Sequence, residues 1–411
     1  MLLLTLNRDG RLLFAARSVR MFAYGAVAVI LVLYLARLGF DGGAIGLILS
    51  LTLIGDTIVS LWLTTHADRL GRRRILVVGS LLMAGAGAVF ALTDAFVPLL
   101  LAATIGVISP SGNEVGPFLA VEQASLSETI EDRRRTSIFA WYNLAGSIAT
   151  AFGALAAGLA VGSMRAMGLD ELSAYRVVVL GYAAIGLALA ALFSRVSPSV
   201  EVTAPTDTSV ARRLGLHRSR NIVLGLAALF SIDAFAGGLV MQSILAYWFH
   251  QTYDVPVALL GGIFFAANLL AAASALAAAG IAARIGLINT MVFTHLPSNV
   301  LLILVPLMPN LPLAIAVLLA RFSISQMDVP TRQSYTIAVV EPDERSAAAG
   351  VTGIARSIGS GASANLAGPL VSTPSLAALP FFIAGGLKIV YDVLLWMAFK
   401  ARPAPEETAR R

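Results

Sequence analysis

The sequence predicts an all-α membrane protein with twelve transmembrane helices arranged in two six-helix, pseudo-symmetric halves. Hydrophobic residues make up 58% of the 411 residues and charged residues only 13%, whereas an ordinary soluble domain has about 25% charged residues. Apolar stretches long enough to cross a bilayer recur along the chain, and the basic residues lie between them. This composition excludes a water-soluble fold, and the lack of cysteine excludes thiol nucleophiles and cysteine-bound metals.

A window of about twenty residues, the helix length that crosses the hydrocarbon core, locates the spans. The first half of the chain contains candidate spans at residues 12–37, 44–65, 74–93, 97–122, 137–161 and 175–194. The second half contains candidate spans at residues 222–247, 256–282, 287–308, 311–334, 346–370 and 377–399. The polar segment between them is rich in Pro, Ser, Thr and Arg, which favours a linker. We therefore expect an N-terminal half at 1–194, a cytoplasmic linker at 195–221 and a C-terminal half at 222–411.

The positions of arginine predict the orientation. Loops on the side of both termini carry most of the arginines, whereas the opposite loops carry only Arg37, Arg165 and Arg176. Cytoplasmic loops are enriched in basic residues, so we expect both termini in the cytoplasm and the chain in the cell (inner) membrane. The linker is expected to be a solvated tether, with a short basic helix over 211–220 on the lipid surface as the alternative.

The two halves resemble each other weakly at a nearly constant offset. At an offset of 210 residues, Gln123, Arg135, Ser147 and Gly158 fall on Gln333, Arg345, Ser357 and Gly368, and at 213 residues Phe22 and Gly25 fall on Phe235 and Gly238. Two six-span repeats in the same orientation are the simplest explanation.

The same alignment places opposite charges at equivalent positions, because Glu122 falls on Arg332 and Arg20 falls on Asp233. If a pseudo-two-fold axis runs along the membrane normal, Glu122 and Arg332 are candidates for a gate that holds the halves together on the cytoplasmic side. The alternative is that each charge pairs within its own half, for example Asp328 with Arg332 at i, i+4. The sequence favours neither arrangement.

The loop between the second and third spans carries the most specific motif. Residues 64–73 read TTHADRLGRR, which resembles the signature G-x-x-x-D-R-x-G-R-R of the major facilitator superfamily. The match covers Asp68, Arg69, Gly71, Arg72 and Arg73, while Thr64 stands where the family has glycine. The resemblance implies an alternating-access transporter in which these five residues form a conformational switch; the alternative is a basic loop that only sets the topology.

Within the superfamily, the chain most resembles twelve-span drug and metabolite efflux proteins that are driven by protons. It departs from that subfamily in having no arginine in the fourth span and no proline in the glycine-rich fifth span. A remnant of the Gly-Pro pattern stands in the eleventh span, at Gly368 and Pro369.

Ionisable residues inside the spans are functional candidates, because a charge in the bilayer is costly unless it is paired or hydrated. The acids are Asp56, Glu114, Glu122, Asp233, Asp328 and Asp392, and the bases are Arg17, Arg20, Arg321, Arg332, Arg356 and Lys388. Their equal numbers indicate extensive pairing. Lys388 and Asp392, four residues apart on the last span, are expected to form a structural pair.

The fourth span is predicted to be a broken helix, since it contains two prolines and three glycines between residues 106 and 117. Glu114 lies within this stretch and has no basic residue at helical spacing. We therefore expect Glu114 to exchange protons and act as a coupling carboxylate. The alternative is a carboxyl group that bonds to the loosened backbone and never titrates.

The resemblance implies that spans one, four, seven and ten line a central cavity. It places Arg20, Glu114, Asp233 and Arg321 around that space. The broken span adds Asn113 as a cavity candidate, and Asp328 joins it because it lies seven residues from Arg321, on the same helix face. We expect Asp233 to be a second proton-coupling carboxylate. An arginine in such a cavity suits a carboxylate or phosphate, whereas the acids suit a cation or protons. The sequence does not choose between these substrates.

These observations predict a proton-coupled secondary active transporter that moves a small organic solute by alternating access, with efflux favoured. The alternatives are organic-anion uptake, a facilitated carrier, and a lipid flippase or sensor. The sequence contains no phosphate-binding loop and no hydrolase or metalloprotease motif, so we expect no enzyme activity, no cofactor and no metal site. The expected partners are the solute, protons and the lipid bilayer, with no nucleic acid, and the chain is expected to act as a monomer.

Overall fold

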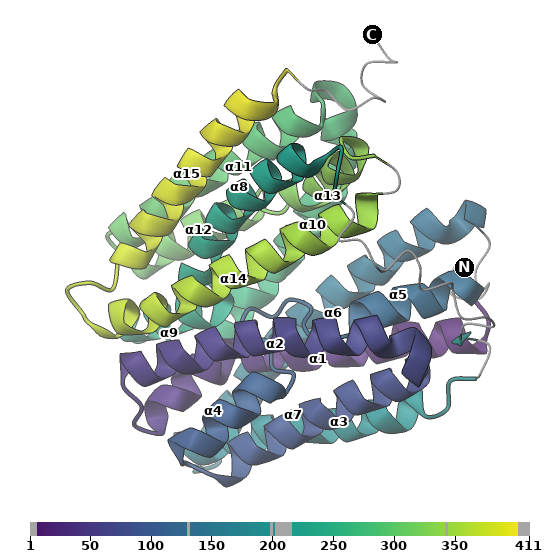
Figure 1. Ribbon diagram of the computed structural model, residues 1–411. Helices are drawn as coiled ribbons and strands as arrows, with labels where there is room; N and C mark the ends of the chain where they lie inside the picture. Colours follow the sequence, from purple (N-terminus) through teal and green to yellow (C-terminus); the bar gives the residue numbers. More distant parts are fainter. Residues whose placement is uncertain (1–5, 130–131, 198–199, 202–215, 342–343, 402–411) are drawn as a thin grey trace. The chain divides into compact units, whose positions relative to one another are not determined.

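The computed structural model describes residues 6–129, 132–197, 200–201, 216–341 and 344–401, and over these ranges it contains helices and no strand (Figure 1). Nine helical segments in the described part of the chain are long and apolar enough to cross a membrane, and one of them, Arg220–Tyr253, is interrupted at residues 240–241. The three remaining expected spans correspond to two interrupted helices and to the helix at residues 345–372. The predicted fold class, an all-α membrane protein, is confirmed.

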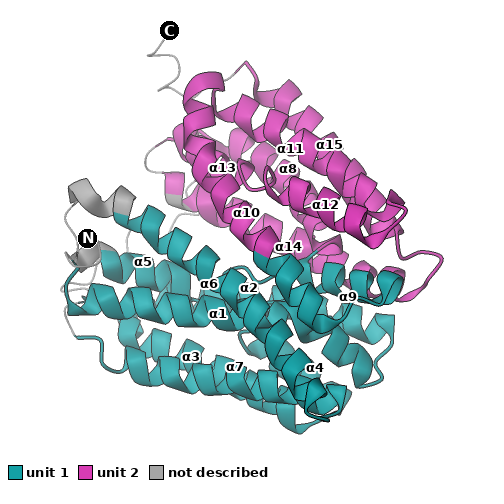
Figure 2. Cartoon of the chain, turned by 180° about the vertical axis from the view of Figure 1, so that it is seen from behind, with its two compact units in different colours: residues 1–207, 241–265 teal, residues 208–240, 266–411 magenta. Residues whose placement is uncertain are grey.

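The chain divides into two compact units, coloured separately in Figure 2: residues 1–207 with 241–265, and residues 208–240 with 266–411. The first unit contains α1 (Arg8–Arg37), α2 (Gly42–Leu70), α3 (Arg72–Leu92), α4 (Phe96–Ile105), α5 (Phe118–Thr129), α6 (Asp132–Ala166), α7 (Glu171–Phe193) and α9 (Gln242–Tyr253). The second contains α8 (Arg220–Leu239), α11 (Leu287–Leu304), η4 (Val305–Leu307), α12 (Leu311–Phe322), α13 (Asp328–Ala338), α14 (Arg345–Ser372) and α15 (Leu379–Phe399). Helix α10 (Val257–Ile285) begins in the first unit and continues in the second.

This division differs from the expected boundaries at 194 and 222. The seventh expected span is interrupted between α8 and α9, and α9 packs against α1 within the first unit. The Ser243 amide donates to the Pro110 carbonyl at 3.2 Å, and a Cβ on Gly158 would lie 2.8 Å from the Cα of Gly261. Hydropathy predicts where a span lies but not which helices it contacts, so this grouping was not visible in the sequence.

Close helix packing occurs at corresponding places in the two units. Helix α1 packs most extensively against α6, and α8 against α14. A Cβ on Gly25 would lie 2.0 Å from the carbonyl oxygen of Thr150, and a Cβ on Gly238 would lie 2.4 Å from the carbonyl oxygen of Ser360. Both distances are too short for any residue other than glycine. Gly25 and Gly238 are a pair in the predicted repeat, and Thr150 and Ser360 are separated by its offset of 210 residues. Small residues that let two backbones approach are a common basis of helix association in membranes.

A methyl group at Gly25 is expected to force α1 away from α6. We expect Gly25→Ala to lower the free energy of unfolding by about 1–3 kcal/mol, as overpacking does. The control is Gly181→Ala, where a Cβ meets nothing within 4 Å and alanine is expected to stabilise the helix by up to about 1 kcal/mol. Thermal unfolding in detergent measures both, and equal melting temperatures for the two variants contradict the role of Gly25.

Candidate functional site

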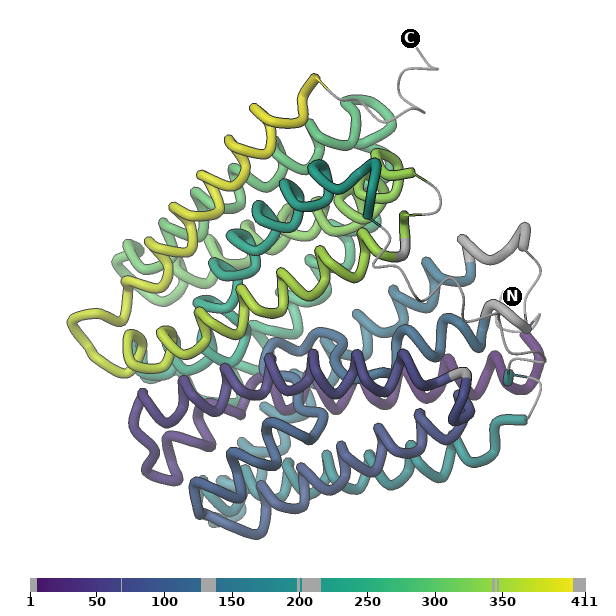
Figure 3. Tube along the Cα trace, in the orientation of Figure 1, coloured from purple at the N-terminus to yellow at the C-terminus, as the bar shows by residue number. Residues whose placement is uncertain are grey.

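The fourth expected span is interrupted, as predicted, by a non-helical stretch at residues 106–117 between α4 and α5, which can be followed in Figure 3. Gly112 and Gly116 have φ of +73° and +80°, a backbone conformation that glycine adopts without strain. Tyr24 donates its hydroxyl hydrogen to the Val115 carbonyl at 3.2 Å, and Ser109 donates to the Asn113 carbonyl at 2.7 Å. Side chains therefore satisfy carbonyls that the helix no longer pairs, as a non-helical backbone inside a membrane requires.

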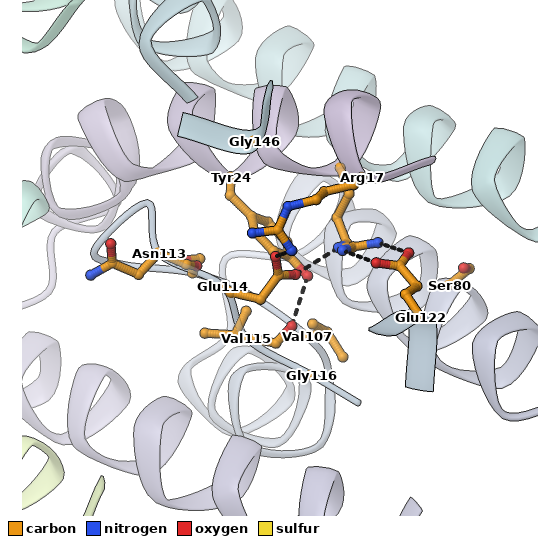
Figure 4. A network of polar contacts seen from close by, with 12 residues as sticks. Arg17, Tyr24, Ser80, Val107, Asn113, Glu114, Val115, Gly116, Glu122 and Gly146 are labelled. Atoms are coloured by element: carbon orange, nitrogen blue, oxygen red, sulfur yellow. Dashed lines mark hydrogen bonds and ion pairs between the residues drawn. The ribbon is translucent and has the colours of Figure 1, made fainter. Parts of the chain in front are cut away.

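A network of charges lies against this stretch in the first unit (Figure 4). The Arg20 guanidinium contacts both oxygens of Glu122, with Nη1 to Oε1 at 2.6 Å and Nη2 to Oε2 at 2.8 Å. Its Nε reaches Oε1 of Glu114 at 2.8 Å, and Nη1 of Arg17 lies 2.8 Å from the other Glu114 oxygen. Two arginines and two carboxylates thus neutralise one another around Glu114.

Burial and aromatic rings support this network. Arg20 and Glu122 are fully buried, while the Glu114 side chain retains 12% of its exposure. The guanidinium of Arg20 lies 4.3 Å from the ring centroid of Phe118, and the Tyr142 hydroxyl donates to Glu122. Bidentate contacts and further hydrogen bonds are what a buried ion pair needs to offset its desolvation cost. Glu114 is therefore the less enclosed carboxylate of the network, although its Oε2 is buried, and Glu122 is the fully enclosed one.

Glu114 has no basic residue at helical spacing in the sequence, but it binds two arginines from another helix. Its partners lie on α1, and Arg20 is 94 residues away in the sequence, so spacing along one helix cannot reveal them. Gly146 on α6 makes room for the second cation, because a Cβ there would lie 2.7 Å from Nε of Arg17. Asn113, expected in the cavity, points away from Arg17 and Glu122 in Figure 4 and is exposed.

A second network occupies the second unit. Asp233 on α8 accepts from Lys388 and, at 2.9 Å, from Nη1 of Arg332, which also lies 3.3 Å from Asp328. The expected pair of Lys388 with Asp392 was wrong, since Lys388 reaches Asp233 on another helix. Asp392 instead contacts two side chains that no sequence motif singled out, Nδ1 of His295 at 2.9 Å and Nδ2 of Asn299 at 2.8 Å.

The two networks correspond with their charges exchanged. Arg20 pairs with Glu122 in the first unit, and Asp233 pairs with Arg332 at the equivalent positions of the second. In this structure Glu122 and Arg332 each pair within their own half, which is the arrangement that the sequence offered as the alternative to an inter-half gate. The predicted repeat thus identified the four residues as equivalent positions, although it did not determine which of them contact each other.

Of the bases expected inside the spans of the second half, Arg321 and Arg356 have no ion-pair partner among the residues that the structure describes. Arg321, at the end of α12, has a buried Nε without a hydrogen-bond partner, and its guanidinium lies 5.1 Å from the ring centroid of Phe322. Arg356 on α14 is exposed. Of the six acids expected inside the spans, by contrast, four contact an arginine or a lysine: Glu114, Glu122, Asp233 and Asp328.

The turn between α2 and α3 contains the residues of the expected switch. Gly71 has a φ of +96°, and the amides of Arg72 and Arg73 donate to the Glu201 carboxylate at 2.7 and 3.2 Å. Glu201 belongs to the expected linker and was not a candidate; a carboxylate is favoured at a helix N-terminus. Arg69 is exposed, and the side chain of Asp68 lies outside the part of the chain that the structure describes.

The far end of the linker segment is held in the second unit by Glu344. The amides of His217, Arg218 and Ser219 donate to its carboxylate at 2.6, 2.9 and 2.8 Å, just before α8 begins. Burial disfavours the charged form, but the hydrogen bonds outweigh it and lower the pKa of Glu344 to about 2. Residues 202–215, which include the first half of the alternative basic helix at 211–220, lie outside the described residues.

Removing Arg20 is expected to leave Glu122 buried without a cation. We expect Arg20→Met to lower the free energy of unfolding by about 3–5 kcal/mol, and the double variant with Glu122→Gln to recover part of that loss. Arg37→Met is the control, since the Arg37 side chain is 54% exposed beside Glu171 and such pairs contribute about 1 kcal/mol or less. Thermal unfolding of the four proteins tests this, and a double variant no more stable than Arg20→Met alone contradicts it.

Comparisons with known proteins agree with this architecture. The sequence profile of the Major Facilitator Superfamily matches residues 13–364. An uncharacterized membrane protein of Saccharomyces cerevisiae, YJR124C, is 30% identical over 427 residues, which cover 96% of this chain and 94% of the yeast protein. Among solved structures, the nucleoside transporter NupG is similar with a TM-score of 0.76 and 16% identity, covering 96% of this chain and 100% of NupG. The D-xylose-proton symporter is similar with a TM-score of 0.71 and 14% identity, covering 97% of this chain and 98% of the symporter. The chain therefore belongs to the major facilitator superfamily and is a multi-pass membrane transporter of small solutes, not an enzyme.

Proposed function

We propose that the transported solute is a small organic anion. The observation that carries this proposal is the imbalance of partners in the second unit. Asp233 and Asp328 contact Arg332 or Lys388, whereas Arg321 and Arg356 have no ion-pair partner among the described residues. Of the two substrate classes left open by the sequence, an anion is the one that these unpaired cations suit.

The chemistry of Arg321 supports a carboxylate or phosphate group on the solute. A guanidinium presents a planar fork of donors that matches either group. Its buried Nε has no acceptor, and an unsatisfied buried donor costs about 1–3 kcal/mol. An anionic solute that supplies this acceptor gains that energy on binding, whereas a cationic solute meets two unpaired positive charges.

Transport measurements test the substrate class. In proteoliposomes, we expect saturable flux of organic carboxylates or phosphates and none of organic cations. Arg321→Gln and Arg356→Gln are each expected to raise KM on the order of tenfold or more, the effect of losing one hydrogen bond to a charged group. Arg284→Gln is the control, because Arg284 is an exposed residue at the end of α10. Transport of cations alone, or an unchanged KM in both variants, rejects an anionic substrate.

We propose that protons drive the flux, with Glu114 and Asp233 as the coupling carboxylates. Glu114 is the partly exposed member of its network and binds two arginines, so a change in its protonation alters contacts to α1. Asp233 likewise contacts two cations in the second unit, Arg332 and Lys388, so a change in its protonation alters those contacts. Efflux remains the predicted direction, and the cytoplasmic termini in the cell membrane remain the predicted orientation.

Neutralising Glu114 is expected to separate solute movement from proton movement. In liposomes that contain a pH-sensitive dye, wild-type protein should acidify or alkalinise the lumen only when the solute is present. Glu114→Gln and Asp233→Asn should lose this signal. Asp94→Asn should retain it, since the Asp94 side chain is 58% exposed beside Arg176. Full solute-dependent proton flux in Glu114→Gln removes that residue from the coupling, and solute flux without proton flux in wild type indicates a facilitated carrier.

We propose, finally, that the turn from Asp68 through Arg69, Gly71, Arg72 and Arg73 acts as the conformational switch. Support comes from the Arg72 and Arg73 amides, which are held by Glu201 from a segment distant in sequence. A contact between the start of α3 and the linker segment can be released without unfolding α3.

A further inference from the structure

Asp56 on α2 is an intramembrane acid that the networks described above do not include. Its Oδ1 accepts a hydrogen bond from the Gly116 amide at 2.7 Å and another from the Ser60 hydroxyl at 3.2 Å. Its Oδ2 has no hydrogen-bond partner among the residues that the structure describes, and the residue is partly buried. One oxygen is therefore engaged, and the other is open.

The charged and titratable groups around Asp56 include no cation in the described part of the chain. Those that interact with it electrostatically are Glu114, from the stretch 106–117, Tyr24 on α1 and Tyr182 on α7. The neighbouring helices α3, α4 and α5 add no charged partner to this set. A carboxylate at this depth without a cation is costly in its ionised form, which distinguishes Asp56 from Glu114, Glu122, Asp233 and Asp328.

The contact with Gly116 links Asp56 to the site. Gly116 lies in the turn two residues after Glu114 and has a φ of +80°. A hydrogen bond from an amide to a carboxylate is roughly twice as strong as one to a neutral acceptor. The charge on Asp56 therefore holds the turn that carries Glu114, and it also repels the Glu114 carboxylate.

We propose that Asp56 is a proton-binding site that controls the turn at residues 112–116. A proton taken from water bonds to the open Oδ2 and makes the side chain neutral. The Gly116 hydrogen bond weakens, the repulsion of Glu114 is removed, and the turn loosens. This inference deepens the proposed function, because a proton on Asp56 would be a coupling proton, but its test needs no solute.

The natural lack of cysteine provides the test, since a single introduced thiol reacts without background. Asn113 is exposed and lies three residues before Gly116 on the same stretch. In Asn113→Cys, the rate of labelling by a water-soluble maleimide is measured between about pH 5 and about pH 8 and divided by the thiolate fraction, which has its own pH dependence. We expect the corrected rate to rise on the order of tenfold toward acid pH, as the charge-assisted bond is lost.

Variants of Asp56 assign this change to the proposed site. Adding Asp56→Asn, which mimics the protonated side chain, should hold the corrected rate at its acid value at every pH, whereas Asp56→Glu should retain a pH dependence. The control is Asp41→Asn, an exposed acid that caps α2 through the Ala44 amide; asparagine caps as well as aspartate. This variant should behave as Asn113→Cys alone.

Two outcomes overturn the proposal. One is a corrected rate in Asn113→Cys that does not change with pH, which decides the matter even if Asp56→Asn fails to fold. The other is an unchanged pH dependence in the Asp56→Asn background. Neither depends on Arg321 or on any solute, so failure of anion transport and failure of the Asp56 site are separate results.

Discussion

The bidentate contact between Arg20 and Glu122 is the interaction on which the polar interior of the first unit depends. Both side chains are fully buried, and an unpaired charge inside a bilayer costs at least about 2.5 kcal/mol. The fork of the guanidinium satisfies both oxygens of Glu122 and leaves Nε for Glu114. Because the charges of this cluster cancel, α1, α5 and the stretch 106–117 can all bring ionised groups into the interior of one unit.

The second unit reuses the same positions with the charges exchanged, and the two networks differ in what they leave open. In the first, Glu114 keeps some exposure, and Asp56 has no cationic partner within the described ranges of the chain. In the second, the carboxylates of Asp233 and Asp328 are neutralised while two arginines lack partners among the described residues. On the proposed function, the first unit supplies proton-binding acids and the second supplies the cations that recognise an anionic solute.

Interrupted helices place these groups. The non-helical stretch 106–117 contains Asn113 and Glu114. Helix α8 ends at Leu239, six residues after Asp233. The gap between α12 and α13 separates Arg321 from Asp328. A backbone that leaves the helix inside a membrane must line a cavity or be buried in protein. The charged side chains therefore lie where the chain already bears the cost of exposing backbone polar groups.

The sequence by itself determined the features that depend on local composition. Hydropathy predicted the membrane spans, and prolines and glycines predicted the break that contains Glu114. A nearly constant offset of 210 to 213 residues predicted which positions in the two halves correspond. The TTHADRLGRR loop indicated the family. Each of these follows from residues that are neighbours in the chain or from a comparison of the chain with itself, so no knowledge of packing is needed.

The tertiary structure decided the partners. Glu114 has no base at helical spacing, yet it binds Arg17 and Arg20 from α1. Lys388 forms its ion pair with Asp233 on another helix and not with Asp392, four residues away on its own helix. The capping of α3 by Glu201 likewise joins segments that are far apart in sequence. A long side chain can pair with a residue on any helix that packs around it. Its partner therefore depends on which helices are in contact and on how each helix is rotated about its axis. Spacing along a single helix carries no information about either.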